Sequence, residues 1–282
     1  MASNTRTPKA RALGSALREA REEQGLGLRQ LASELGKNAG QLSRWENGER
    51  APRPTDVAQI LTHLGVNGER YEEIIAICSG TDEPRWLAVT LPEQRQQLGA
   101  LLEFERAATT ITEVSPLLIP GLLQTSDYAR AIMSAGGVPA NDVETRIAVR
   151  LGRRDVILRR DPAQLVALVG EAALRQVIGA PEVMVEQLEY LGEMAELTNV
   201  DLRVLPFSSG WHPALEGLFL LIESEQTPVV QLESRRSGLF LHEPEDVQTY
   251  REAADTVRQA AMSPEDSSAF IAEIAKDMEA AP

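Results

Sequence analysis

The spacing of apolar residues and glycines in the first quarter of the chain constrains the fold more than any other feature. Apolar side chains recur there every three or four residues, which is the period of an amphipathic helix. Each run is short and stops at a turn signal such as Gly25-Leu26-Gly27, Gly36 or Asn47-Gly48. The pattern therefore predicts a compact module of short helices. We place five of them at about residues 10–24, 28–35, 39–46, 54–64 and 69–78.

The third of these helices has one face suited to packing and another left for solvent. Leu42 and Trp45 share the inner face, and Asn38 is a favourable N-cap. Ala32 is small enough for the second helix to cross closely, and Gly36 permits a turn with φ > 0. The outer face then carries Ala39, Gly40, Gln41, Ser43 and Arg44. A short helix exposed in this way is able to enter a DNA major groove, N-terminus first.

From Leu13 to Leu64 the sequence resembles the phage-repressor-like helix-turn-helix regulators, known as the xenobiotic-response-element (XRE) family. The shared segments, in order, are L-R-x-x-R, G-L, L-A-x-x-L-G, S-R-x-E-N-G and a following proline. The resemblance implies a lambda-repressor-like fold and sequence-specific DNA binding. It also implies a structural ion pair between Arg21 and Glu46. The base-reading positions of the family match Ala39, Gly40, Gln41 and Arg44.

Two of those base-reading positions, Ala39 and Gly40, carry no hydrogen-bonding side chain. We therefore expect base readout to depend on Gln41, Ser43 and Arg44, with a methyl contact from Ala39 to thymine. Arg44 is the candidate for a bidentate contact to guanine. The candidates for phosphate contacts are Arg29, Lys37, Asn38, Asn47, Arg50 and Arg53. Three alternatives stay open: Arg44 touches only phosphate, Gln41 faces solvent, or the module binds protein.

The charge distribution matches this assignment better than the net charge does. The whole chain carries 28 basic and 42 acidic residues, a net charge of -14. Residues 1–53 carry ten basic and six acidic residues, whereas the remainder carries 18 and 36. The positive charge is therefore concentrated where the DNA reader is predicted, and the acidic remainder would be repelled by phosphates.

The remaining sequence alternates helical patterns with short β-branched and apolar runs. Strand signals stand at Leu165–Val169, Asp201–Leu205, Leu218–Ile222 and Val229–Leu232. The last three follow one another closely and predict a small, mostly antiparallel sheet. The predicted fold class is mainly α, with a five-helix module followed by a larger α+β domain. The predicted divisions are a flexible tail (1–9), the helix-turn-helix domain (10–80), a linker (81–92) and the α+β domain (93–282).

Most of residues 95–275 resembles the C-terminal domain of WhiJ-like actinobacterial regulators. The most distinctive stretch is IPGLLQT-x-x-YAR, from Ile119 to Arg130. This resemblance implies a small partner protein, encoded nearby, that tunes DNA binding. From the residues alone, Ile119-Pro120-Gly121 is either a packing corner, meaning a turn whose side chains pack inside the domain, or a ligand site. Trp211-His212-Pro213, in a loop between predicted strands, reads as an ordinary surface segment or a contact for a ligand or partner.

No residue pattern for catalysis or metal binding stands out. The three histidines are isolated from one another, and Cys78 is the single cysteine. The sequence contains no GxSxG, GxxxxGK[ST] or GxGxxG segment. We therefore expect no enzyme activity, no metal site and no cofactor. The lone cysteine and the lack of a long apolar run predict a cytoplasmic protein that does not span a membrane.

These observations support one principal function and two rivals. The principal one is a transcriptional regulator that binds double-stranded DNA as a homodimer, since one short recognition helix buries too little surface for tight binding. Its α+β domain would serve regulation, partner binding and dimerisation. The first rival is an antitoxin-like sequestering protein whose DNA binding mainly autoregulates its operon. The second rival is a receptor for a small-molecule ligand held in the α+β domain.

Overall fold

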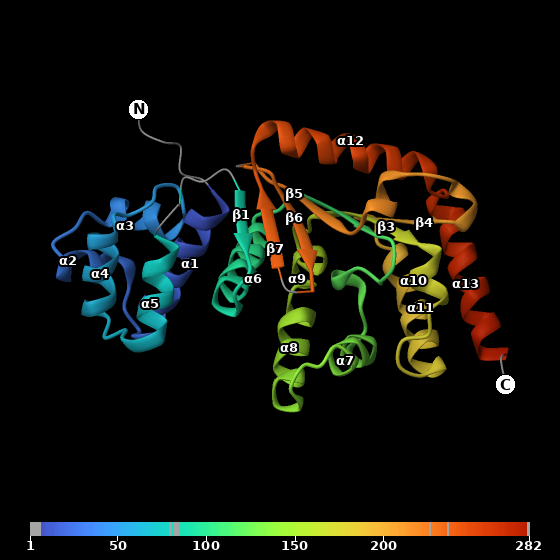
Figure 1. Ribbon diagram of the computed structural model, residues 1–282, viewed down its shortest axis with the longest axis horizontal. Coiled ribbons are helices and arrows are strands. Elements are labelled where there is room, and N and C mark those ends of the chain that lie inside the picture. Colours follow the sequence, from blue (N-terminus) through green and yellow to red (C-terminus); the bar gives the residue numbers. More distant parts are fainter. Residues whose placement is uncertain (1–6, 79–80, 82–84, 226, 236, 281–282) are drawn as a thin grey trace. The chain divides into compact units, whose positions relative to one another are not determined.

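The computed structural model describes residues 7–78, 81, 85–225, 227–235 and 237–280 (Figure 1). The chain divides into two compact units. The first unit comprises residues 1–107 and 226–247, and the second comprises residues 108–225 and 248–282. Each unit is built on its own core, and the fold as a whole is mostly helical, as the sequence predicts.

The first unit begins with the five predicted helices. They are α1 (Pro8–Glu23), α2 (Leu28–Glu34), α3 (Ala39–Glu46), α4 (Pro54–His63) and α5 (Gly68–Ile77). The turns between them use glycines with positive φ, among them Gly25, Gly36 and Gly48. The buried side chains form the apolar stripe that the periodicity indicated: Leu13, Leu17, Leu31, Leu42, Trp45, Val57, Ile60, Leu61, Ile74 and Ile77.

The start of α1 reaches into the predicted N-terminal tail. Thr7 is its N-cap, and the Thr7 hydroxyl accepts a hydrogen bond from the backbone N–H of Ala10 at 3.1 Å. Pro8 then occupies the first helical position, where its fixed φ suits a helix. Residues 1–6 of the predicted tail lie outside the described residues.

The first unit also contains α6 (Leu91–Arg106) and three strands. The strands are β1 (Arg85–Ala88), β6 (Val229–Ser234) and β7 (Ser237–Leu241), and β7 pairs antiparallel with both others. Phe240 of β7 stacks with Trp86 of β1 at 6.0 Å between ring centroids and lies 5.8 Å from Phe104 of α6. Strand β1 therefore stands inside the segment predicted as a linker, where it is fixed by aromatic packing.

The second unit combines parallel strands with helical crossovers. Its strands are β2 (Thr110–Ser115), β3 (Gln164–Gly170), β4 (Val200–Leu205) and β5 (Phe219–Glu223). Its helices are α7 (Ser126–Ala135), α8 (Ala140–Gly152), α9 (Asp155–Leu158), α10 (Glu171–Arg175), α11 (Pro181–Ala195), α12 (Pro244–Ala260, which begins in the first unit) and α13 (Pro264–Ala280). Three single turns complete it: η1 (Gly121–Leu123), η2 (Phe207–Ser209) and η3 (Pro213–Glu216).

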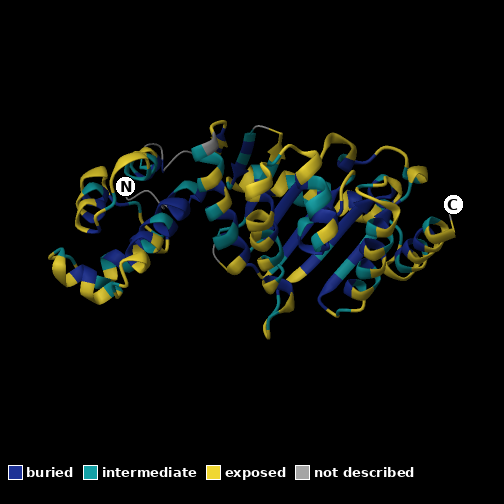
Figure 2. Cartoon of the chain, turned by 90° about the horizontal axis from the view of Figure 1, so that it is seen from below, coloured by how far each residue is buried: buried dark blue, intermediate teal, exposed yellow. Residues whose placement is uncertain are grey.

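The sheet is larger than the small, mostly antiparallel sheet that the sequence predicts, and one part of it is parallel. The strands form a seven-stranded mixed sheet in the order β1-β7-β6-β5-β2-β3-β4. β3 pairs in parallel with β2 on one side and with β4 on the other, and β5 runs antiparallel to β2. The physical reason is that helices separate β2 from β3 and β3 from β4, and a helical crossover returns the chain parallel to the strand it left. Figure 2 shows these strands largely buried, while the outward faces of the helices are exposed.

Candidate nucleic-acid interface

Helix α3 is held in place by its ends and by its inner face. The Asn38 side chain caps the helix by accepting a hydrogen bond from the Gly40 N–H at 2.8 Å. Leu42 and Trp45 are buried, so the helix is anchored in the core through these two side chains. Gly14 of α1 lies so close that a Cβ there would be 2.5 Å from the Trp45 carbonyl oxygen. The contact between α1 and α3 therefore requires glycine at this position.

Arg21 and Glu46 form a bidentate ion pair at the end of α3. The Arg21 Nε donates to Glu46 Oε1 and its Nη2 donates to Oε2, both at 2.8 Å. A third bond from Arg21 Nη1 reaches the Leu26 carbonyl at 2.8 Å. Both charged residues are buried, and the hydrogen bond to Glu46 raises the pKa of Arg21 above its usual value. The pair ties α1 to α3 and holds the turn before α2.

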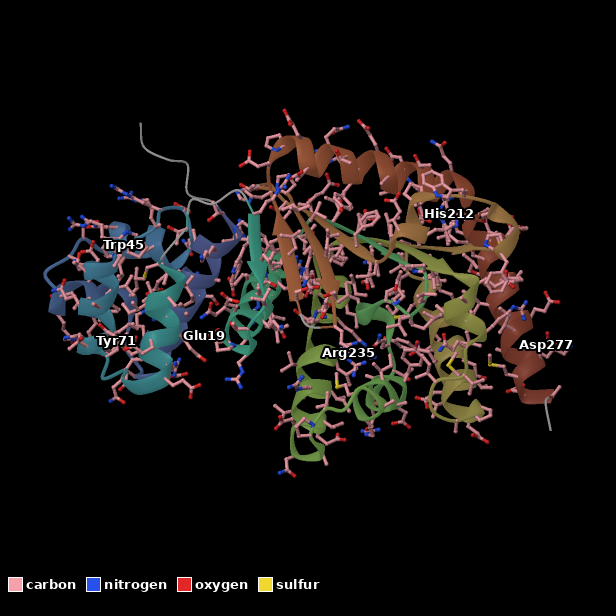
Figure 3. The ribbon with its side chains drawn as sticks, viewed as in Figure 1. Glu19, Trp45, Tyr71, His212, Arg235 and Asp277 are labelled. Atoms are coloured by element: carbon pink, nitrogen blue, oxygen red, sulfur yellow. The ribbon has the colours of Figure 1, made fainter. Side chains whose placement is uncertain are left out.

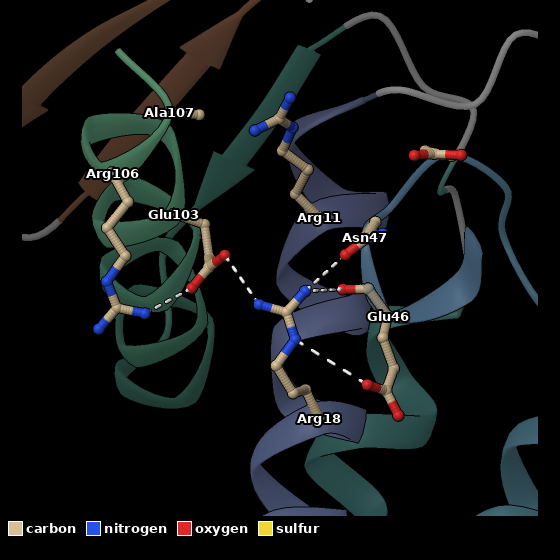
Figure 4. Close-up of a pocket in the computed structure, with 8 residues that line it drawn as sticks. Arg11, Arg18, Glu46, Asn47, Glu103, Arg106 and Ala107 are labelled. Carbon is tan, nitrogen blue, oxygen red and sulfur yellow. Dashed lines mark hydrogen bonds and ion pairs between the residues drawn. The ribbon is translucent and has the colours of Figure 1, made fainter. Parts of the chain in front are cut away.

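Arg18 makes a second link to the end of α3. Its Nη2 donates to the Glu46 carbonyl at 3.1 Å and to Asn47 Oδ1 at 2.7 Å. Its Nη1 lies 3.3 Å from Glu103 of α6, which also pairs with Arg106 (Figure 4). These residues line an open pocket of about 320 Å³. The roles of Arg18 and Glu103 are not predicted from the sequence, although the L-R-x-x-R spacing does place Arg18 on the same helical face as Arg21.

A second polar cluster lies beside α3, around the buried carboxylate of Asp56 in α4. Lys37 Nζ donates to Asp56 at 2.7 Å, and Arg53 Nε donates at 3.1 Å. Burial acts to raise the pKa of Asp56, but the hydrogen bonds from Lys37 and Arg53 outweigh it and hold that pKa below its usual value. The Lys37 side chain is itself mostly covered, whereas the Arg53 side chain is 81% exposed.

A hollow of about 270 Å³ opens next to this cluster. Its lining residues are Gln41, Trp45, Arg50, Ala51, Arg53 and Asp56. Three of the predicted DNA-contacting residues, Gln41, Arg50 and Arg53, therefore surround one concave surface beside α3. Figure 3 labels Trp45 within the five-helix module, among side chains that carry nitrogen atoms.

Three arginines near α3 differ from the paired ones. Arg29, Arg44 and Arg50 are exposed. Within the described part of the chain, their guanidinium groups have no hydrogen-bond or ion-pair partner. Neighbouring cations at Arg18, Arg21 and Lys37 all contact carboxylates. Positive charge that is left without an internal partner at an exposed surface is available to an anionic ligand.

The predicted DNA contacts differ in exposure, and some of them also make contacts within the module. Those that face solvent beside α3 are Arg29, Asn38, Gly40, Arg44, Asn47, Arg50 and Arg53 as exposed residues, with Ala39, Gln41 and Ser43 half-buried. Four of these candidates also make internal contacts. Lys37 and Arg53 donate to Asp56. The Asn47 amide oxygen accepts from Arg18, and the Asn38 side chain caps α3. The Asn47 amide nitrogen also lies 3.4 Å from Ser43 Oγ.

The described residues also bear on metal centres and on membrane-spanning helices. Among residues 7–78, 81, 85–225, 227–235 and 237–280, no group of three or more His, Cys, Asp or Glu side chains could hold a metal ion. Within the same residues, no helix has the length and apolarity needed to cross a bilayer. The one cysteine, Cys78, is half-buried, and burial raises the pKa of its thiol to about 11.

Comparisons with known proteins assign both parts of the chain. Residues 12–74 match a family described as "Helix-turn-helix domain". Residues 98–273, more than half of the chain, match the family described as "Domain of unknown function (DUF5753)". Searches of curated proteins and of solved structures find no match. The first match supports a DNA-binding regulator. The chain thus belongs to the DUF5753 family and carries a helix-turn-helix domain ahead of the domain that defines it.

Proposed function

We propose that this protein is a sequence-specific DNA-binding transcriptional regulator that reads the major groove with α3. The observation that carries the proposal is the set of exposed arginines, Arg29, Arg44 and Arg50, that have no ion-pair partner among the described residues. They surround a helix whose opposite face is anchored by Leu42 and Trp45. A rigid helix with an unneutralised cationic surface suits recognition of a phosphate-bearing groove.

Base readout and backbone contacts come from different residues in this proposal. Arg44 makes a bidentate contact to guanine, Gln41 and Ser43 hydrogen-bond to neighbouring bases, and Ala39 contacts a thymine methyl group. The lack of a side chain at Gly40 lets the backbone approach the groove. Phosphate contacts come from Arg29, Asn38, Arg50 and Arg53. Lys37 and Asn47 act through the internal bonds that they make to Asp56 and Arg18.

The regulator acts as a homodimer, in the manner of the XRE-family proteins it resembles, and performs no catalysis. Two recognition helices on half-sites about one helical turn apart give the buried area that one eight-residue helix lacks. The region matching DUF5753 adjusts this binding through a small partner protein or ligand, as in the WhiJ-like regulators. The protein works in the cytoplasm, where its DNA target lies. The five-helix fold and the helix-turn-helix match support the DNA-binding part of this proposal.

The test is a mobility-shift assay of the full chain on the DNA upstream of its own gene. Random DNA is the competitor, and the assay is repeated at two salt concentrations. We expect a complex that survives the competitor and weakens as salt rises, because phosphate contacts release counterions. Two results would contradict the proposed regulator function. One is a complex that random DNA removes at both salt concentrations, and the other is no complex at all. The alternative to pursue would then be that the helix-turn-helix module binds protein.

A further inference from the structure

The connection between β4 and β5 exposes three large apolar side chains within nine residues. Phe207, Trp211 and Leu215 are 70%, 71% and 61% exposed. We call these three side chains the 207–215 patch. The other two tryptophans of the chain, Trp45 and Trp86, are buried at 2% and 4% exposure. A single exposed leucine is ordinary on a protein surface, but an exposed Trp and Phe four residues apart need a reason.

The backbone that carries the patch is fixed at several points within the second unit. The Phe207 N–H donates to Glu171 Oε2 at 2.8 Å, and the Ser209 hydroxyl donates to the Ala260 carbonyl at 3.1 Å. His212, labelled in Figure 3, and Ala214 are buried and anchor the middle of the segment. The short turns η2 and η3 order the chain on either side of His212. The patch is therefore a set of apolar side chains presented by an anchored segment.

Such a presentation is typical of the centre of a protein interface. Aromatic side chains held in one conformation lose little entropy on binding, and Trp is enriched among the residues that dominate binding energy. An aromatic side chain buries about 150–250 Å² when fully covered, so 70% exposure leaves roughly 100–175 Å² to cover on each. The apolar area of these two aromatic side chains is removed from water only if another protein surface covers both of them.

We propose that the 207–215 patch is the apolar centre of a contact with a second copy of this chain. This inference rests on the proposed function, because reading two half-sites requires two copies held together. In a two-fold contact the four aromatic side chains would bury roughly 400–700 Å², against about 1,200 Å² for a small stable interface. The two copies of Leu215 and a surrounding polar rim supply the remainder. The contact is isologous, so one patch serves both copies.

Charge sets the strength of this contact. The second unit carries 23 acidic and 12 basic residues, a net charge of -11. Two such units repel each other, and salt screens that repulsion. The dimer therefore tightens as salt rises, whereas binding of a basic protein to the same acidic unit would weaken. The salt dependence of binding therefore distinguishes a second copy of this chain from a basic partner protein.

The experiment is sedimentation velocity of the full chain without DNA, over a range of protein concentrations and at low and high salt. We compare the wild-type chain with a Phe207→Ser/Trp211→Ser double variant. The matched control is Leu158→Ser, which removes a 53% exposed apolar side chain from α9 of the same unit. All altered side chains are mostly exposed, so each variant should fold, and circular dichroism verifies this.

We expect a wild-type dimer that tightens with salt, a double variant weakened at least about tenfold, and a control that matches wild type. Emission from Trp211 should also shift to shorter wavelength as wild-type protein is concentrated. A wild-type chain that stays monomeric, or a double variant that dimerises as well as wild type, would overturn the proposal. DNA binding by the wild-type protein is measured in a separate mobility-shift assay. A patch-dependent dimer that binds no DNA therefore refutes the proposed function alone.

Discussion

The outer face of α3 and the corner from Ile119 to Thr125 are the two most distinctive segments of the sequence, and they use their polar groups in opposite ways. Around α3, the guanidinium groups of Arg29, Arg44 and Arg50 have no partner within the described part of the chain. In the corner, the polar groups form hydrogen bonds with neighbouring elements of the same unit. The first segment is therefore available to an external partner, whereas the second stabilises its own unit.

Several hydrogen bonds among the described residues close the corner. The N–H groups of Ile119, Gly121 and Thr125 donate to Tyr128 Oη, Glu113 Oε1 and Gln187 Oε1. The side chains of Gln124, Arg150 and Gln187 donate to Ile119 O, Gln124 Oε1 and Leu123 O, each at 2.7 Å. Burial and bonding of this density indicate the packing-corner reading of the Ile119-Pro120-Gly121 motif. A recognisable motif can thus mark a structural junction as easily as a binding surface.

Loss of the Glu46 carboxylate should have the largest effect on stability. Glu46→Ala strands the buried Arg21 guanidinium, and breaking a buried ion pair costs about 3–5 kcal/mol. The measurement is thermal unfolding followed by circular dichroism. An Arg21→Met/Glu46→Met variant is the control and should recover most of the loss, since no unpaired charge remains buried. An unchanged melting temperature in Glu46→Ala would refute the structural role of the pair.

Removal of the Gln187 amide tests whether hydrogen bonds stabilise the corner from Ile119 to Thr125. Gln187 is fully buried and bonds to the Leu123 carbonyl and the Thr125 N–H. Gln187→Leu leaves both backbone groups unsatisfied, which should cost about 2–4 kcal/mol in the free energy of unfolding by urea. Gln164→Leu, at an exposed position of β3, is the control and should change little. Equal effects of the two substitutions would show that the corner is not held by its hydrogen bonds.

Acid should weaken the first unit through Asp56. The pKa of this carboxyl is lowered in the folded state, so its contribution to stability is present above the unfolded pKa of about 3.9. That contribution is lost as pH falls below about 4 and the carboxyl is protonated. We expect Asp56→Asn to lower stability at neutral pH and to flatten the acid limb of a urea-midpoint profile. A profile with the same slope in both proteins would contradict this assignment.

The features that were predicted correctly from the sequence depend on residues close together in the chain. The five helices of the first unit, the turn at Gly36 and the inward positions of Leu42 and Trp45 all follow from periodicity and turn chemistry over a few residues. Strands β1 and β7 did not follow, because each is four or five residues long and their pairing joins segments about 150 residues apart. Non-local pairing leaves little trace in local pattern.

In the candidate interface, too, local sequence patterns predicted exposure but not contacts between helices. The exposed positions on α3 follow from its helical period. The internal roles of Lys37 and Asn47 do not, because their partners Asp56 and Arg18 lie on other helices. Spacing in one helix gives no sign of such contacts. The parallel pairing of β3 with β2 and with β4 was readable in principle, since helical patterns separate those strands.

The most direct test of the account concerns Arg44, whose exposed side chain should add nothing to folding. Arg44→Ala should leave the melting temperature unchanged. Its affinity for the operator should fall by about 1–3 kcal/mol, with relaxed choice at one base pair, while binding to random DNA changes much less. The measurement is a titration of wild-type and variant protein on both DNAs at one fixed salt concentration. An equal loss on both DNAs, or no loss on either, would contradict base readout by α3.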